Sequence, residues 1–201
     1  MNKPTLDYYN TQALNFVAHT VDVDFSEIQN SFLDYIPAGG SILDFGCGSG
    51  RDTKYFLGKG YHVDAIDGSE ELCKIATEYT GIPVKQMLFD ELNAVEQYDG
   101  IWACASILHV EKKRLPQLIK KMAAAVKKGG TVYVSFKYGD FEGERSGRCF
   151  TDLTEISFKE VMKDIPELSI EKIMITSDVR VGRGDEKWLN IILKRNKNRL
   201  F

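Results

Sequence analysis

The sequence lacks the features that would mark a membrane or secreted protein. No run of about 18 apolar residues occurs, which excludes a membrane span. The first residues, Met1–Tyr9, lack the apolar stretch of a signal peptide. An excess of basic charge is also missing, since 26 basic and 29 acidic residues give a formal net charge of −3. This balance excludes nucleic-acid binding driven by overall charge but leaves a local basic patch open.

Closely spaced metal-ligand pairs are absent as well. The four cysteines, Cys47, Cys73, Cys104 and Cys149, stand far apart and form no C-x-x-C pair, the arrangement that zinc sites favour. We therefore expect no metal site. Free thiols in a chain without a secretion signal fit a reducing compartment, so the sequence predicts a cytoplasmic protein.

Length and composition indicate one domain. At about 150 residues per domain, 201 residues correspond to about 1.3 domains, and 43% hydrophobic with 27% charged residues is ordinary for a globular protein. No repeat or linker divides the chain. We expect a single domain over 1–201, with an N-terminal helical cap segment at 1–38 and an α/β core at 39–201. Within the core, we expect the loop at 138–152 to act as a substrate lid.

Apolar runs alternate with amphipathic stretches along this core. Short strands are predicted at 41–45, 62–66, 83–88, 98–104, 131–136, 168–177 and 187–194. Helices are predicted at 11–35, 51–58, 69–79, 111–127 and 154–163, the fourth ending at Lys127-Lys-Gly-Gly130. This alternation implies a mostly parallel sheet with helices on both faces. The last two strands have no helix between them, which implies one antiparallel pairing.

A glycine-rich loop is the strongest functional signal. Asp44-Phe-Gly-Cys-Gly-Ser-Gly50 stands where the first strand runs into a helix, the place where open α/β sheets bind nucleotides. Glycines there allow close approach to the backbone, and the helix N–H groups favour an anion. Asp67 follows the second strand, 67 − 46 = 21 residues beyond Gly46, which suits hydrogen bonding to ribose. The G-x-G-x-G spacing differs from the dinucleotide G-x-G-x-x-G, and no P-loop motif occurs.

With these motifs the chain resembles the class I S-adenosylmethionine-dependent methyltransferases. Asp44-x-Gly-x-Gly-x-Gly50, Asp67, Tyr98-Asp-Gly-Ile-Trp102 and Lys128-Gly-Gly130 match that family over roughly 40–137. The narrower runs Gly46–Thr53 and Ala105–Val110 resemble its tellurite-resistance-type, small-molecule branch. The resemblance implies a Rossmann-like seven-stranded sheet in the order 3-2-1-4-5-7-6, with strand 7 antiparallel.

The resemblance also implies a cofactor, S-adenosyl-L-methionine, and its product S-adenosyl-L-homocysteine. The loop glycines would lie beside the methionine portion, and Asp67 would hold the ribose. Leu88 and Phe89 would hold the adenine, with Asp90 as an alternative. An acid is common in the family where Leu88 stands here, so backbone groups would recognise the base. The expected cofactor-binding residues are Tyr9, Asp44, Gly46, Cys47, Gly48, Gly50, Arg51, Asp67, Gly68, Leu88, Phe89 and Ala105.

Three residues of the site have more than one interpretation. Tyr9 could contact the methionine end or the sulfonium, or simply pack the first helix. Arg51 could pair with the methionine carboxylate or face solvent. His109, just past strand four, is the candidate catalytic base; it could instead orient the substrate or cap the next helix. Ser106 has a similar placement with less chemical reach.

Basic residues cluster in two predicted loops at the same sheet edge. Lys137, Arg145 and Arg148 lie in or beside the first, and Arg180 and Arg183 lie in the second. Guanidinium groups bind carboxylate or phosphate in a bidentate way, so Arg148 and Arg183, with Ser106 and His109, are the expected substrate-binding residues. Interleaved acids leave mutual surface pairing as the alternative.

The sequence therefore predicts methyl transfer to a small, anionic acceptor by in-line displacement, which depends mainly on positioning. Two alternatives remain: a tRNA or rRNA methyltransferase, and a non-catalytic module that binds S-adenosylmethionine. The acidic pI and the absence of an added RNA-binding domain argue against a nucleic-acid partner. We expect no membrane partner. The sequence does not specify the oligomeric state.

Overall fold

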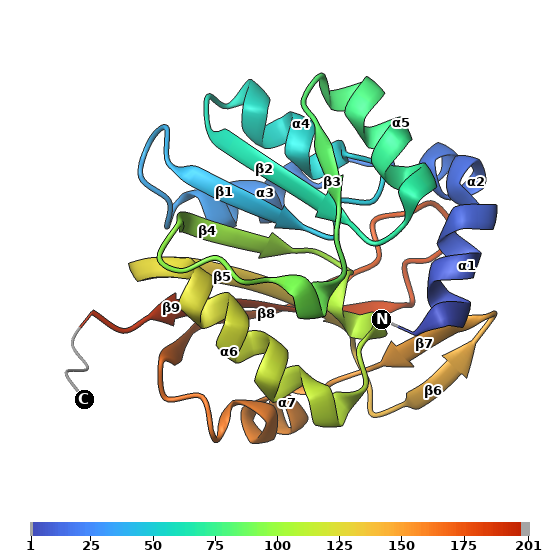
Figure 1. Ribbon diagram of the computed structural model, residues 1–201. Helices are drawn as coiled ribbons and strands as arrows, with labels where there is room; N and C mark the ends of the chain where they lie inside the picture. The colour runs from blue at the N-terminus through green and yellow to red at the C-terminus, as the bar shows by residue number, and fades with distance from the viewer. Residues whose placement is uncertain (1, 198–201) are drawn as a thin grey trace.

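Seven strands form the central sheet of the computed structural model, which describes residues 2–197 (Figure 1). Their order is β3-β2-β1-β4-β5-β9-β8. The strands are β1 (Ser41–Phe45), β2 (His62–Asp67), β3 (Val84–Gln86), β4 (Tyr98–Ala103), β5 (Val126–Lys137), β8 (Leu168–Ser177) and β9 (Lys187–Arg195). Strand β9 runs antiparallel to both neighbours, and the other pairs are parallel. This confirms the predicted order. The predicted domain limits extend to Met1 and 198–201, which lie outside the described residues.

Helices cover both faces of the sheet (Figure 1). One face carries α3 (Ser26–Leu33), α4 (Arg51–Gly58) and α5 (Glu70–Thr80), and the other carries α6 (Leu115–Ala125) and α7 (Glu155–Met162). Neighbouring strand residues point to opposite faces, so Ile42 packs with Phe56 of α4, whereas Leu43 joins the cluster that contains Leu118 of α6. Both faces of the sheet are therefore buried, as a parallel sheet requires.

The N-terminal segment consists of separate helices where one helical stretch over 11–35 was expected. They are α1 (Lys3–Thr11), α2 (Ala13–Ala18) and α3. The Asn2 side chain accepts a hydrogen bond from Thr5 N at 3.1 Å, and this cap starts α1 well before residue 11. Ser69 Oγ, at the start of α5, donates to Asn10 Oδ1 at 2.7 Å. Helix α1 is thereby held beside the carboxyl end of β2 (Figure 1).

The junction between α6 and β5 also differs from the prediction. The helix ends at Ala125, and 127–130 belong to β5, not to the end of a helix. Gly129 has a φ of +76°, and the register with β4 jumps from Val126 to Thr131 while β4 advances by two residues. The glycine pair therefore forms an irregularity inside a strand, because only glycine adopts this backbone conformation without strain.

Residues 138–152 contain a hairpin where the sequence predicted a loop. Strands β6 (Glu142–Arg145) and β7 (Arg148–Thr151) pair antiparallel across a two-residue turn. Ser146 and Gly147 both have positive φ, +49° and +78°, as a type I′ turn requires. The hairpin lies beside α1 (Figure 1), and Cys149 N donates to Thr5 Oγ1 at 3.0 Å.

Within residues 2–197, no helix is long and apolar enough to cross a membrane. No group of three or more His, Cys, Asp or Glu side chains in this part of the chain is arranged to hold a metal ion.

Candidate active site

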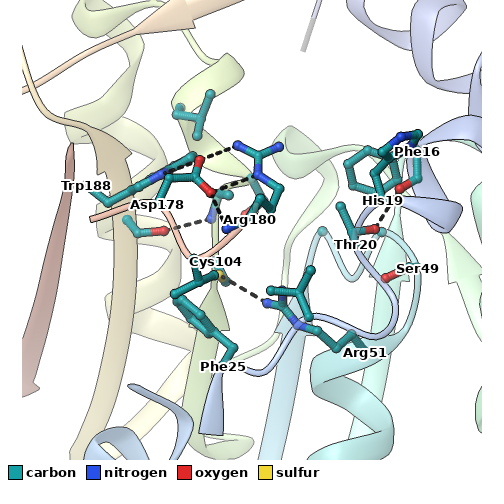
Figure 2. Close-up of a pocket in the computed structure, with 18 of the residues that line it drawn as sticks. Phe16, His19, Thr20, Phe25, Ser49, Arg51, Cys104, Asp178, Arg180 and Trp188 are labelled. Carbon is teal, nitrogen blue, oxygen red and sulfur yellow. Dashed lines mark hydrogen bonds and ion pairs between the residues drawn. The ribbon is translucent and has the colours of Figure 1, made fainter. Parts of the chain in front are cut away.

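A cavity of about 960 Å³ opens at the carboxyl edge of the sheet. It is enclosed by the glycine loop after β1, by α1 and α2, by the residues after β4, by the hairpin and by the β8–β9 loop. Phe16, His19 and Thr20, in α2 and just after it, lie across the cavity from Asp178 and Trp188 (Figure 2). The volume is at the upper end of the range of roughly 300–1,000 Å³ for ligand pockets, so it has room for two small ligands together.

The glycine loop forms a cradle that has no room for a side chain at Gly46 or Gly48. Gly46 and Gly48 have φ values of +89° and +55°, and both line the cavity. A Cβ on Gly46 would stand 2.5 Å from Ser106 Cβ, and one on Gly48 would stand 3.0 Å from the Phe16 ring. The backbone N–H groups of Gly46 and Cys47 donate to Ile66 O at 3.0 and 2.9 Å, which ties the loop to β2. The loop is therefore rigid and open toward a ligand.

Asp67 lies at the end of β2 and faces this cradle. Its Oδ2 accepts from Gly48 N at 2.9 Å, and its Oδ1 accepts from Ser69 N at 2.8 Å. Burial raises the pKa of this carboxyl, while the backbone hydrogen bonds oppose the rise. Each carboxylate oxygen can accept a further hydrogen bond. The geometry thus suits two ribose hydroxyls, and the cradle and carboxylate together fit S-adenosylmethionine.

Asp44 and Gly50 belong to the same motif but do not line the cavity. Asp44 is buried beneath the loop, where its Oδ2 accepts from Thr53 Oγ1 at 2.6 Å, and burial raises its pKa. A Cβ on Gly50 would stand 2.8 Å from Thr80 Cγ2, which indicates that this glycine permits close packing of α4 on α5. Both residues support the loop from below.

Phe89, Leu88 and Gly68 of the expected cofactor site differ in whether they line the cavity. Phe89 is buried, lines the cavity and packs on Phe45 with ring centroids 4.8 Å apart. Gly68 and Leu88 lie just outside the lining. A Cβ on Gly68 would stand 2.8 Å from Leu6 Cδ2, so α1 covers this point. Leu88 N donates to Glu91 Oε2 at 2.6 Å, so that backbone group is already engaged.

Arg51 lines the cavity, but its guanidinium is paired within the protein. Its Nε donates to Asp52 Oδ1 at 2.7 Å. The central carbon of the guanidinium lies 4.8 Å from the centroid of the Phe25 ring, and Figure 2 shows the two side chains near each other. Asp52 also accepts from Trp102 Nε1 at 2.8 Å and from Gln29 Nε2 at 2.7 Å. Burial alone would raise the pKa of Asp52, but these partners hold it below its usual value. Arg51 is therefore a wall of the cavity and is not a solvent-facing residue.

Tyr9 and His109, 100 residues apart, meet inside the cavity. The Tyr9 hydroxyl lies 2.7 Å from His109 Nε2, and His109 Nδ1 lies 2.6 Å from the Cys149 carbonyl oxygen. A carbonyl only accepts, so Nδ1 carries the proton and the tyrosine donates to Nε2. Burial lowers the pKa of His109 to about 4, and the Arg148 charge adds to this effect. His109 is therefore neutral near pH 7, and its lone pair is occupied by Tyr9.

This neutral histidine makes a pH-dependent contribution to stability. Because its pKa is about 4 in the folded state and about 6.5 when unfolded, the contribution is complete above pH 6.5 and is lost as the pH falls toward 4. We expect wild-type protein to lose about 2 kcal/mol more unfolding free energy than His109→Gln between pH 6.5 and 4.5. Urea unfolding at each pH measures this difference. The exposed His62 supplies the control, since His62→Gln should follow the wild type; equal slopes for wild type and His109→Gln would contradict the assignment.

Ala105 and Ser106 join the loop after β4 to the rest of the site. Both line the cavity, but Ser106 Oγ donates to Phe45 O at 2.6 Å, and Ala105 N donates to Ser135 Oγ at 2.8 Å. Ser106 also contacts the face of Gly46. Its geometry is that of a support for the glycine loop.

All five cations of the two predicted loops line the cavity. Four of them pair with acids: Arg145 with Asp152, Arg180 with Asp178, and Lys137 and Arg183 with Glu186. Figure 2 shows the Arg180–Asp178 pair, with Trp188 Nε1 also donating to Asp178 at 3.0 Å. Arg148 forms no ion pair within residues 2–197. Mutual pairing, the alternative interpretation, therefore holds for every cation of this set except Arg148.

Some residues of the cavity were not anticipated. Phe16 closes over Gly48, and Trp188 and Asp178 form the far wall (Figure 2). Phe16 was assigned only to a helical apolar face, and nothing in the local sequence indicates that α2 places it over the glycine loop. Asp178 directly follows β8, so its place at the end of a strand was the available clue.

Comparisons with known proteins agree with this geometry. A family model described as a methyltransferase domain matches residues 42–130. An uncharacterized methyltransferase of Staphylococcus carnosus is 28% identical over 187 residues, which is 87% of each chain. The probable S-adenosyl-L-methionine-dependent methyltransferase TehB of Haemophilus influenzae is 30% identical over 94 residues, which is 44% of this chain and 33% of that one. The 1,6-didemethyltoxoflavin-N1-methyltransferase of Burkholderia thailandensis superimposes with a TM-score of 0.74 at 17% identity, covering 94% of this chain and 84% of that one.

The fold and the glycine-loop site define an S-adenosylmethionine-dependent methyltransferase. Residues 42–130 match the methyltransferase-domain model, and the chain has the fold of the class I enzymes, as its motifs predicted. The match to TehB agrees with the narrower resemblance to the tellurite-resistance-type branch.

Proposed function

We propose that this methyltransferase acts on a small-molecule acceptor held in the same cavity as the cofactor. The observation that carries the proposal is the lining of the cavity. The glycine loop, Asp67 and Phe89, which suit the cofactor, line it together with Ser135, Trp188 and the hairpin, which leave room for an acceptor. A cavity of about 960 Å³ that is roofed by helices and a hairpin suits a compact acceptor better than a polymer chain.

The first group of residues would hold the cofactor. Asp67 would accept from the ribose hydroxyls, the loop backbone would pack against the methionine portion, and Phe89 would contact the base. When bound, S-adenosylmethionine supplies an electrophilic methyl group on its sulfonium. The protein's task is then to place the acceptor atom in line with that group at about 3–3.5 Å and to exclude water.

His109 serves in this proposal as a positioning residue and not as a base that touches the acceptor. Its Nε2 already accepts from the Tyr9 hydroxyl, and its low pKa makes it a weak proton acceptor. By accepting the hydrogen bond from Tyr9, His109 fixes the direction of the hydroxyl proton and leaves the lone pairs of the Tyr9 oxygen for other donors. An acceptor that carries an O–H or N–H group could donate to that oxygen.

A solved neighbour supports the choice of acceptor class. The Burkholderia thailandensis enzyme was crystallised with 1,6-didemethyltoxoflavin and S-adenosylhomocysteine bound together. Its shared fold therefore accommodates a small acceptor beside the cofactor in that protein, and the cavity of this chain offers the corresponding space.

Labelled S-adenosylmethionine tests the proposal directly. The protein is incubated with separate pools of small metabolites, total RNA and protein, and label is counted in each. We expect label in the metabolite pool only. Label in RNA would establish an RNA methyltransferase instead. Tight cofactor binding, measured by calorimetry, without transfer to any pool would indicate a non-catalytic module.

A further inference from the structure

The cations of the cavity differ in whether they are neutralised. Arg51, Lys137, Arg145, Arg180 and Arg183 each lie within ion-pair distance of an acid. Arg148, at the start of β7, has no such partner within residues 2–197, and its Nε is buried without a hydrogen-bond acceptor there. An unpaired, buried donor on a charged group is costly, so its retention needs a reason.

Aromatic rings hold the Arg148 guanidinium in place. Its central carbon lies 4.3 Å from the ring centroid of Tyr8, 5.1 Å from that of Phe150 and 5.8 Å from that of Tyr9. Cation–π contacts of this kind stabilise the charge through the flat face of the group. The N–H donors lie in the plane of the guanidinium, at its edge, and Nε–H has no acceptor among residues 2–197. The rings therefore orient the group and leave this donor for an oxyanion.

Arg148 lies beside the residues where methyl transfer is proposed to occur. It stands next to Tyr9, whose hydroxyl is held by His109. The neighbouring residue Cys149 binds Thr5 of α1 through its N–H and His109 through its carbonyl. These bonds fix the backbone that carries Arg148 relative to both the cap helix and the site. An anion bound at Arg148 would thus lie close to Tyr9 and His109 in the cavity.

We propose that Arg148 binds an anionic group, a carboxylate or a phosphate, on the methyl acceptor. A planar oxyanion accepts two parallel N–H bonds from one guanidinium edge, which orients the acceptor as well as holding it. The inference rests on the proposed function and narrows it to small acids. It assigns no such role to Arg183, which lies 3.7 Å from Glu186 and is about half exposed.

Binding of simple anions tests this subsite without turnover. Benzoate and inorganic phosphate are titrated by calorimetry into protein saturated with S-adenosylhomocysteine. We expect at least one of them to bind the wild type and to bind Arg148→Gln at least tenfold more weakly, with Arg148→Lys between the two. Arg114→Gln, a surface variant outside the cavity, is the matched control and should bind as the wild type does. Failure of both probes to bind wild type, or equal binding by Arg148→Gln, would overturn the proposal.

The cofactor's own carboxylate is the competing ligand for Arg148. S-adenosylhomocysteine carries that carboxylate and 5′-methylthioadenosine does not, so both are titrated into wild type and Arg148→Gln. We expect unchanged affinity for each, together with thermal unfolding that shows a folded variant. Weaker binding of S-adenosylhomocysteine alone would assign Arg148 to the cofactor and overturn the acceptor subsite.

The labelled-donor assay separates this inference from the proposed function. Metabolite products are passed over an anion-exchange column, and we expect label in the retained fraction with wild type and at least tenfold less with Arg148→Gln. Labelled metabolites that all flow through would overturn the anionic subsite while leaving a small-molecule methyltransferase. Failure of the wild type to bind S-adenosylhomocysteine at all would instead overturn the proposed function.

Discussion

Replacing Asp67 with Asn is expected to weaken S-adenosylhomocysteine binding roughly 100-fold, about 2.7 kcal/mol. The carboxylate uses one lone pair on each oxygen for Gly48 N and Ser69 N and has the others free for ribose hydroxyls. In the variant, one of these oxygens becomes an NH₂ group, which cannot accept from a backbone N–H or from a donating hydroxyl. Isothermal titration calorimetry measures the loss.

Two controls separate cofactor contact from loop collapse. Asp164→Asn changes an exposed acid after α7 by the same chemistry and should bind like the wild type. Circular dichroism must show that Asp67→Asn is folded at the temperature of the titration. A folded variant whose affinity stays within about threefold of the wild type would remove Asp67 from the cofactor site.

Replacing Gly46 with Ala is expected to lower the free energy of unfolding by about 3–4 kcal/mol. Two costs add: a left-handed φ of +89° that alanine adopts poorly, and a Cβ only 2.5 Å from Ser106 Cβ. Ser106 is buried and anchored to Phe45 O, so it cannot simply turn away. Urea unfolding gives the magnitude.

A second substitution distinguishes the two costs. Ser106→Gly removes the Cβ that a new Cβ on residue 46 would meet. In the Ser106→Gly background, Gly46→Ala should therefore lower the free energy of unfolding only about half as much as it does in the wild type. The backbone cost of residue 46 would persist in both backgrounds. Strictly additive effects would show that the clash is absorbed elsewhere and that only the backbone conformation matters.

The family resemblance implied the order of the sheet, and the pattern along the chain implied its type. The strand–helix alternation selects a mostly parallel sheet, and the position of Asp44–Gly50 and Asp67 at strand ends brings them to one edge. Residues just after a strand, such as Ala105 and His109, are located by the same rule. The glycine loop and Asp67 could therefore be predicted from the pattern along the chain alone.

Contacts between distant segments could not be predicted from that pattern. Tyr9 and His109 were each predicted to lie in the site, but their hydrogen bond depends on the position of α1 against the sheet. The alternating charges of the two loops look alike in sequence, yet Arg145 and Arg180 are neutralised and Arg148 is not. That difference depends on how the hairpin folds.

Glycine caused two of the errors of local structure. At Gly129 the pair of glycines was taken as a helix stop, although a positive φ serves an irregular strand equally well. At Ser146-Gly147 the dipeptide was placed in a loop, although it is suited to a tight hairpin turn. In both cases the residue type specifies the backbone angle but not the element around it.

One residue of the hairpin connects two other segments that enclose the cavity. The N–H of Cys149 donates to the Thr5 side chain of α1, and its carbonyl oxygen accepts from the His109 ring. Moving the hairpin away from the cavity would therefore break both hydrogen bonds, whereas moving α1 alone would break only the one to Thr5.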